Sequence, residues 1–276
     1  NNFFVSSVKN MTTNSNISII IPFHELTEDT KKLFPNAVQS VKEQTVKPDE
    51  LIIVVPKGSE VAEYAKSFDY GDLASSVVIA ENEGETDFAS QYNYGASVAK
   101  SEFVSLLEFD DELAKIWVKN VVEYKAAYPE VGIFMPIIVD VDPNGQFIGF
   151  TNEAVWAQSF SDELGVLDNN ALLAYQNFNI DGMVIKKSLI DEYGGFKSNI
   201  KLTFIYEFLL RMTFKAVRTM VIPRFGYKHV NQRPNSLFAS YKTTMDPTEA
   251  KWWLNQAKKE YYFNKDRTIT YQQPTV

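Results

Sequence analysis

Four short apolar runs alternate with segments of helical periodicity along the chain. The runs ISIII (17–21) and ELIIVV (50–55) lack polar alternation, so each predicts a strand that is buried on both faces. The runs EFVSLLEF (102–109) and VGIFMPIIV (131–139) predict two further strands. Strands that alternate with helices predict an α/β fold with a doubly wound, mostly parallel central sheet flanked by helices, in which ligands bind beyond the carboxyl ends of the strands.

Apolar residues three or four positions apart predict the helices between these strands. The apolar stripes of the predicted helices are Leu33, Ala37, Val38 and Val41; Phe88, Tyr92, Gly95 and Ala99; and Trp117, Val121, Tyr124 and Tyr128.

The second half of the chain is less regular. DPNG (142–145) is a turn signal between two extended segments and predicts a hairpin, whereas residues 151–180 predict loops or short helices. Thr203 is a candidate cap of an apolar helix that continues to about residue 215. Asp246, followed by Pro and three residues later by Glu, predicts the start of a C-terminal helix.

Composition narrows the functional class. The chain has 276 residues, 45% of them apolar, and a net charge of −8, which suits a soluble globular enzyme and disfavours a nucleic-acid partner. No apolar run reaches the roughly 18 residues of a transmembrane segment, and the first ten residues lack the pattern of a secretory signal, so we expect a cytoplasmic location. Because cysteine is absent, a metal would need oxygen ligands or one of the two histidines, His24 and His229.

Three acids stand where the third apolar run ends. In LLEFDDEL, Glu108 and Asp110 would share one side of an extended chain, and Asp111 begins the following loop. Like charges repel and are costly to desolvate, so such a cluster needs open water or a cation. Mg²⁺ and Mn²⁺ prefer oxygen ligands and often use one or two carboxylates, with phosphates and water completing the shell. The alternative is a solvated loop or helix N-terminus.

The order and spacing of several segments resemble family 2 glycosyltransferases with the GT-A fold. The resemblance rests on the segments IIIPFHE, AVQSVKEQTVKPDELIIVV, QYNYGASVAKSEFVSLLEFDDEL and MVIKKSLIDEYGGF. The resemblance covers about residues 17–236 and implies a transferase domain there, with a donor half to about residue 125 and an acceptor half after it. Residues 1–16 would then be an N-terminal extension and 237–276 a C-terminal helical extension.

The resemblance implies roles for the three acids. Asp110 corresponds to the principal metal ligand, for Mn²⁺ or Mg²⁺. Glu108 corresponds to the acid that contacts the ribose or the metal, where relatives more often have Asp. Asp111 would lie at the edge of the site and orient the ion or the donor sugar.

The resemblance also implies a donor site. Pro22, His24 and Glu25 correspond to the turn that contacts the nucleotide, although His24 could equally be an ordinary loop residue. Asn93 matches a donor-side position and could equally be a surface amide of a helix. In VVPKGSE, Pro and Lys replace the two acids that many relatives have, so the nucleotide is not identified by the sequence.

Two residues of YKHVNQRPNS correspond to the family segment near the diphosphate. His229 could ligate the metal or, when protonated, stabilise the leaving diphosphate, and Arg233 could do the latter with a fixed charge. A packed histidine and a solvated arginine are the alternatives.

An inverting transfer needs a base on the acceptor side. Relatives have a Glu-Asp pair about six residues before an Arg on a late helix, and here Phe204 and Ile205 occupy that register. Our first candidate is therefore Glu207, and the second is Asp181. Glu207 also stands four residues before Arg211, a spacing that favours a simple ion pair on a helix.

The sequence thus predicts a metal-dependent, inverting glycosyltransferase that uses a nucleotide-diphosphate sugar and an acceptor of unknown class: glycan, lipid or protein. The alternative is a catalytically lapsed module for carbohydrate binding or assembly. A nucleotidyltransferase is a third possibility, but the sequence lacks the glycine-rich phosphate loop that such enzymes usually have. The chain is also similar to glycosyltransferase-like proteins of large tailed phages, which would place it in host cytoplasm or on a virion. The oligomeric state is left open.

Overall fold

The computed structural model describes residues 14–275, so most of the predicted extension 1–16 lies outside the described residues. The strands are β1 (Ile17–Pro22), β2 (Glu50–Pro56), β3 (Ser76–Asn82), β4 (Phe103–Leu106), β5 (Glu112–Leu113), β6 (Ile133–Val141), β7 (Phe147–Thr151), β8 (Val166–Leu167), β9 (Val184–Lys186) and β10 (Thr219–Val230). The helices are α1 (Glu28–Lys42), α2 (Glu60–Ser67), α3 (Phe88–Val98), α4 (Trp117–Ala127), α5 (Asn169–Ala174), α6 (Lys187–Tyr193), α7 (Phe204–Phe214), α8 (Leu237–Thr244) and α9 (Pro247–Glu260), with a 3₁₀ turn at Glu153–Trp156.

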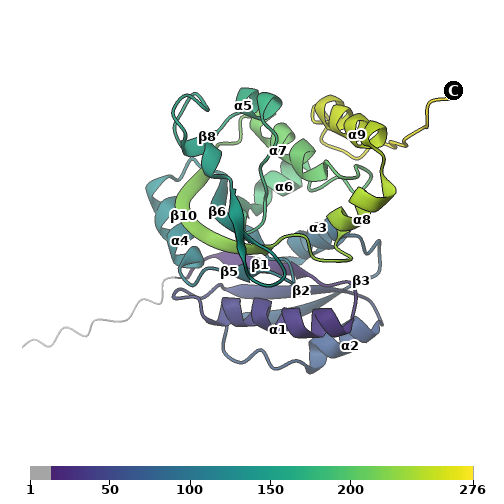
Figure 1. The fold of residues 1–276 in the computed structure, drawn as a ribbon. Helices are drawn as coiled ribbons and strands as arrows, with labels where there is room; N and C mark the ends of the chain where they lie inside the picture. Colours follow the sequence, from purple (N-terminus) through teal and green to yellow (C-terminus); the bar gives the residue numbers. More distant parts are fainter. Residues whose placement is uncertain (1–13, 276) are drawn as a thin grey trace, which may run out of the picture.

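One mixed sheet runs through the molecule in the order β3-β2-β1-β4-β9-β6-β10-β5 (Figure 1). The first four strands in this order are parallel, and so are β6 and β10. β9 is antiparallel to both β4 and β6 and joins the two parallel halves. The predicted mostly parallel α/β sheet is confirmed, and β4 ends beside β1 in its centre.

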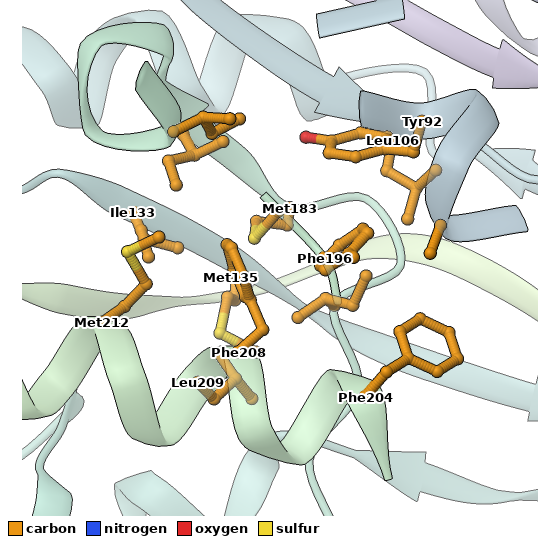
Figure 2. Packing of buried hydrophobic residues seen from close by; sticks show 14 of the residues in the cluster. Tyr92, Leu106, Ile133, Met135, Met183, Phe196, Phe204, Phe208, Leu209 and Met212 are labelled. Carbon is orange, nitrogen blue, oxygen red and sulfur yellow. The ribbon is translucent and has the colours of Figure 1, made fainter. Parts of the chain in front are cut away.

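Two apolar cores lie on the two faces of the sheet. Helices α1, α2 and α4 cover one face, and α3, α7 and α9 lie over the other (Figure 1). Residues of β1 alternate between these cores: Ile19 and Ile21 belong to the first and Ile20 to the second. Figure 2 shows the second core, in which Phe208, Leu209 and Met212 of α7 pack beneath the sheet residues. Burial on both faces explains why the strand sequences are continuously apolar.

Local signals fix the ends of the helices that lead into the site. Asp87 caps α3, with its side chain accepting from the Ser90 N–H. Gly95 of α3 lets the helix approach the sheet, since a Cβ there would lie 2.5 Å from a methyl group of Ile20. Asp246 caps α9 as predicted. α7 begins after Thr203 as expected, but the Thr203 hydroxyl does not cap it and donates to the Trp253 carbonyl at 2.8 Å.

The structure changes the predicted extent of the third strand. β4 ends at Leu106, earlier than the run 102–109 suggested, so the acids lie on an irregular segment and not on alternating strand positions. The DPNG hairpin is confirmed between β6 and β7. Within residues 14–275, no helix is long and apolar enough to cross a membrane.

Candidate active site

Asp111 anchors the segment that follows β4. Its side chain is fully buried and accepts hydrogen bonds from the Tyr227 hydroxyl at 2.8 Å and the Val230 N–H at 2.8 Å. The Nδ1 atom of His229 lies 2.9 Å from Asp111 Oδ2. An ionised carboxylate can only accept hydrogen bonds, so in this contact the proton lies on Nδ1 of His229. Asp111 thereby joins the β4 loop to the end of β10.

Tyr227 holds the backbone of the acidic segment. Its hydroxyl donates to Asp111 and accepts from the Glu108 N–H at 3.0 Å. Its ring leaves no space for a Cβ at Gly182, where the added atom would lie 2.8 Å from the ring. Trp117 supports the same turn, because its Nε1 donates to the Gly182 carbonyl at 2.9 Å. These contacts position Asp181, which immediately precedes the glycine.

Four potential metal ligands meet at this point: Glu108, Asp111, Asp181 and His229. One ligand atom from each lies within 4.8 Å of the others. His229 Nδ1 is 3.4 Å from Asp181 Oδ2 and 3.8 Å from Glu108 Oε2. Three carboxylates therefore face one imidazole, and Asn179 donates a further hydrogen bond to Asp181 Oδ2 at 2.7 Å.

The crowding of carboxylates perturbs several pKa values. Burial, followed by the charges of Asp181 and Asp111, raises the pKa of Glu108 well above its ordinary value. Burial also raises the pKa of Asp181 to about 7, although His229 opposes the shift. For His229, burial lowers the pKa, but the charges of Asp111 and Asp181 outweigh burial and raise it to about 10. The cluster thus holds protons and attracts cations.

Asp110 lies beside this cluster and is paired with Arg233. Arg233 Nε donates to Asp110 Oδ2 at 2.5 Å, and the guanidinium lies over the Phe109 ring at 5.2 Å from its centroid. Burial and then Asp111 raise the pKa of Asp110 to about 6, with Arg233 opposing both. A basic group therefore stands next to the acids, where a phosphate could be bound.

Three of the acids, Glu108, Asp110 and Asp181, line a pocket of about 280 Å³. Among the predicted site residues, its lining includes Pro22, His24, Glu108, Asp110, Asp181, His229 and Arg233. A second pocket of about 300 Å³ contains Glu25. The residues that line both pockets are His24, Phe88, Phe204, Arg233, Ser236 and Leu237. The structure therefore brings the predicted nucleotide turn, the acidic motif and the late basic segment together at the carboxyl ends of β1 and β4.

Two predicted residues lie elsewhere. The Asn93 amide bonds the backbone of Phe196 twice, donating to its carbonyl at 2.8 Å and accepting from its N–H at 2.9 Å. Glu207 is fully buried in ion pairs with Lys197 at 3.0 Å and Arg211 at 2.9 Å. Neither side chain lines either pocket, so we assign both structural positions and leave them out of the site proposed below.

The sequence reasoning missed Tyr227 and Asn179. Tyr227 stands two residues before His229 on β10, a strand that the sequence analysis did not predict; side-chain alternation along this strand places both residues on one face. Asn179 stands two residues before Asp181, but it lies in a loop whose path has no sequence signal.

Comparisons with known proteins identify the family and the fold. A model of the family described as glycosyl transferase family 2 matches residues 18–183. Among solved structures, the chain is similar to residues 1–349 of TarS from S. aureus in complex with UDP-GlcNAc, with a TM-score of 0.60 and 13% identity over 87% of this chain and 65% of the other. It is also similar to the same fragment in complex with UDP, with a TM-score of 0.58 and 14% identity over 89% and 71%.

Similarity at this level of identity shows the fold, and it confirms the GT-A architecture. The chain spans about two thirds of the TarS fragment. A search of curated protein sequences found no match. Because the family model covers more than half of its length, this chain belongs to glycosyl transferase family 2.

Proposed function

We propose that this protein is a metal-dependent, inverting glycosyltransferase that uses a UDP-sugar. One observation carries the proposal: Glu108, Asp181 and His229 converge at one wall of a pocket that Arg233 also enters. The complexes of TarS with UDP and UDP-GlcNAc support uridine as the nucleoside, a choice that the sequence alone left open. His24 and Glu25 line the adjoining pocket and would contact the base and ribose.

The residues present fit a divalent cation. Ligand atoms of Glu108 and His229 lie within 4.8 Å of one another, and Asp110 lines the same pocket. These three residues would hold the cation, and either Mn²⁺ or Mg²⁺ suits carboxylate oxygens. His229 donates through Nδ1 to Asp111, and its raised pKa keeps a proton on Nε2 as well, so a cation would displace that proton to use Nε2 as a ligand. A carboxylate behind a metal-bound imidazole is a common arrangement. When bound, the cation would neutralise charge on the diphosphate.

Asp181 is our proposed catalytic base. It lines the pocket and its pKa of about 7 suits a general base near neutral pH. Asp181 would take the proton of the acceptor hydroxyl as that oxygen attacks the anomeric carbon, and the bond from that carbon to the diphosphate oxygen breaks. Arg233, which carries a fixed charge beside Asp110, would stabilise the leaving diphosphate.

A binding experiment tests the proposal. We expect calorimetry to show UDP binding in the presence of Mn²⁺ and none with a chelator. Asp110→Ala should abolish the metal-dependent part while the protein stays folded. Two results would contradict the metal assignment. One is equal UDP affinity with Mn²⁺ and with chelator, and the other is metal-dependent binding that survives in folded Asp110→Ala.

One observation favours the second candidate, a module that binds a carbohydrate without catalysis. Phe204 and Ile205 line the pocket in the register where relatives have the Glu-Asp pair. Donor binding without transfer or donor hydrolysis over a wide range of acceptors would support this candidate.

We further propose that residues 17–236 form the transferase domain, with the donor half reaching about residue 125, and that α8 and α9 extend it. A phage origin and a cytoplasmic or virion location stay predictions from the sequence.

A further inference from the structure

The pocket that holds the acids also has an apolar wall. Phe204 and Ile205 at the start of α7, Phe88 at the start of α3, and Leu237 and Phe238 of α8 all line it. The rings are close to one another: the centroids of Phe88 and Phe204 are 5.9 Å apart, and those of Phe204 and Phe238 are 6.4 Å apart with an interplanar angle of 10°. Figure 2 shows the Phe204 side chain at the first turn of α7.

Helix α8 presents apolar side chains that are only partly covered by the rest of the described chain. None of its residues is buried, and Phe238 is 40% exposed while Leu237 is 42% exposed. Both side chains line the pocket that contains Asp181 and His229. Apolar surface left open inside a pocket favours an apolar ligand, because its burial there removes both surfaces from water.

This wall is unsuited to the hydroxyl groups of a bare sugar. Buried hydroxyls need hydrogen-bond partners, and the five side chains Phe88, Phe204, Ile205, Leu237 and Phe238 offer none. The polar lining groups lie with the acids, on the segment from Asn231 to Ser236, and at Lys242 farther along α8. The reacting hydroxyl would therefore face Asp181, and the rest of the acceptor would face the apolar wall.

We propose that the acceptor is an alcohol or sugar that carries an apolar group beside its reacting hydroxyl, and that Phe238 is a determinant of this specificity. The inference rests on the proposed transferase function. In the reaction, the acceptor oxygen forms the new bond to the anomeric carbon, its proton passes to Asp181, and the bonding pair leaves with UDP. The apolar group binds the wall and takes no part in the chemistry.

The test compares acceptor pairs that differ only in the aglycone. Methyl, octyl and 4-nitrophenyl glycosides of glucose, galactose and N-acetylglucosamine would be titrated into the protein with UDP and Mn²⁺ present. We expect at least one octyl or nitrophenyl glycoside to bind about tenfold or more tightly than its methyl counterpart. The octyl and nitrophenyl arms distinguish an alkyl from an aromatic group.

Phe238→Ser and Phe263→Ser form a matched pair of variants. Both phenylalanines are 40% exposed, so neither substitution opens the core, but Phe263 lies after α9 against Arg267 and lines neither pocket. We expect Phe238→Ser to remove most of the preference for the apolar glycoside and Phe263→Ser to leave it unchanged.

Two results would overturn the inference: equal affinity for methyl and apolar glycosides in the wild type, or a Phe238→Ser variant that loses UDP affinity and keeps its acceptor preference. The latter would mean that the wall binds the nucleobase. UDP titration without acceptor tests the proposed function separately. If UDP fails to bind, titration of the glycosides alone still shows whether the wall selects apolar groups.

Discussion

Two buried clusters of charged residues lie in this protein and differ in their balance. In the first, Glu207 is paired with Lys197 and Arg211, and Arg211 also donates to the carbonyls of Tyr193, Gly194 and Gly195. In the second, His229 is the one cationic partner of Glu108, Asp111 and Asp181 within residues 14–275. In the first cluster, backbone carbonyls complete the hydrogen bonds of the two cations, and the cluster holds α7 in place. The second has three carboxylates for one imidazole, and we call it the unbalanced cluster. The raised pKa values of Glu108 and Asp181 in it are typical of functional sites.

The largest effect that separates the clusters should be on turnover. Asp181→Asn keeps the shape of the side chain but removes the base, so we expect the transfer rate to fall about 10²- to 10⁴-fold with UDP affinity retained. Glycosyl transfer from UDP-sugars, followed by UDP release, measures this. A rate within twofold of the wild type would exclude Asp181 as the base and reopen the choice among other acids.

The Glu207 cluster should matter for stability. Glu207→Ala leaves Lys197 and Arg211 buried without their carboxylate, so we expect a loss of about 3–5 kcal/mol in the free energy of unfolding. Urea denaturation measures it, with Glu108→Ala as the control. Because Glu108 stands among like charges, its removal should cost far less or stabilise the metal-free protein. If both variants lose a similar free energy of unfolding, the two clusters do not differ in the way proposed.

The pH dependence of stability should reflect the unbalanced cluster. The pKa of Asp181 is raised from 3.8 to about 7, so its contribution to stability is present below pH 3.8 and is lost as the pH rises through 7. The pKa of His229 is raised from 6.5 to about 10, so its contribution is present below pH 6.5 and is lost as the pH rises through 10. Both act in the same direction, and the stability of the metal-free protein should fall with rising pH.

Unfolding in chelator at several pH values between 4 and 8 measures this slope. We expect the Asp181 contribution to amount to about 4 kcal/mol over that range and to be missing in Asp181→Asn. Parallel curves for the wild type and the variant would show that Asp181 titrates normally.

The smallest effect concerns two buried tyrosines. Tyr227→Phe removes the hydroxyl that bonds Asp111 and Glu108, and we expect Mn²⁺ affinity to fall about tenfold, as for other groups that orient metal ligands. Tyr92→Phe is the control, because the Tyr92 hydroxyl is buried and has no hydrogen-bond partner within residues 14–275 (Figure 2). An equal change in both variants would show that Tyr227 does not position the acids.

Sequence patterns predicted the elements that depend on neighbouring residues, such as apolar strands and capped helix ends. The apolar runs around Ile20 and Val54 gave the central strands, and the position of Glu108 and Asp110 after an apolar run located the acidic end of β4. Asp246 predicted the start of α9 from capping chemistry alone. In each case the signal lies within a few residues.

Features that depend on distant segments could not be predicted in the same way. The spacing of Glu207 and Arg211 predicted their ion pair, but nothing near them in sequence indicated that Lys197 would complete it. Asp181 and His229 meet only because β9 and β10 belong to the same sheet as β4. Asn93 carries a family-like motif, yet its amide is used by the backbone of Phe196, a contact formed by folding.

Electron spin-echo spectroscopy of bound Mn²⁺ tests the central claim most directly, because it detects nitrogen nuclei coordinated to the ion. The chain contains only two histidines, so the assignment needs two variants. The account predicts a signal from one imidazole nitrogen in the wild type with UDP, its loss in His229→Gln, and its retention in His24→Gln. A spectrum without imidazole coupling, or with coupling that survives in His229→Gln, would contradict a metal site that includes His229.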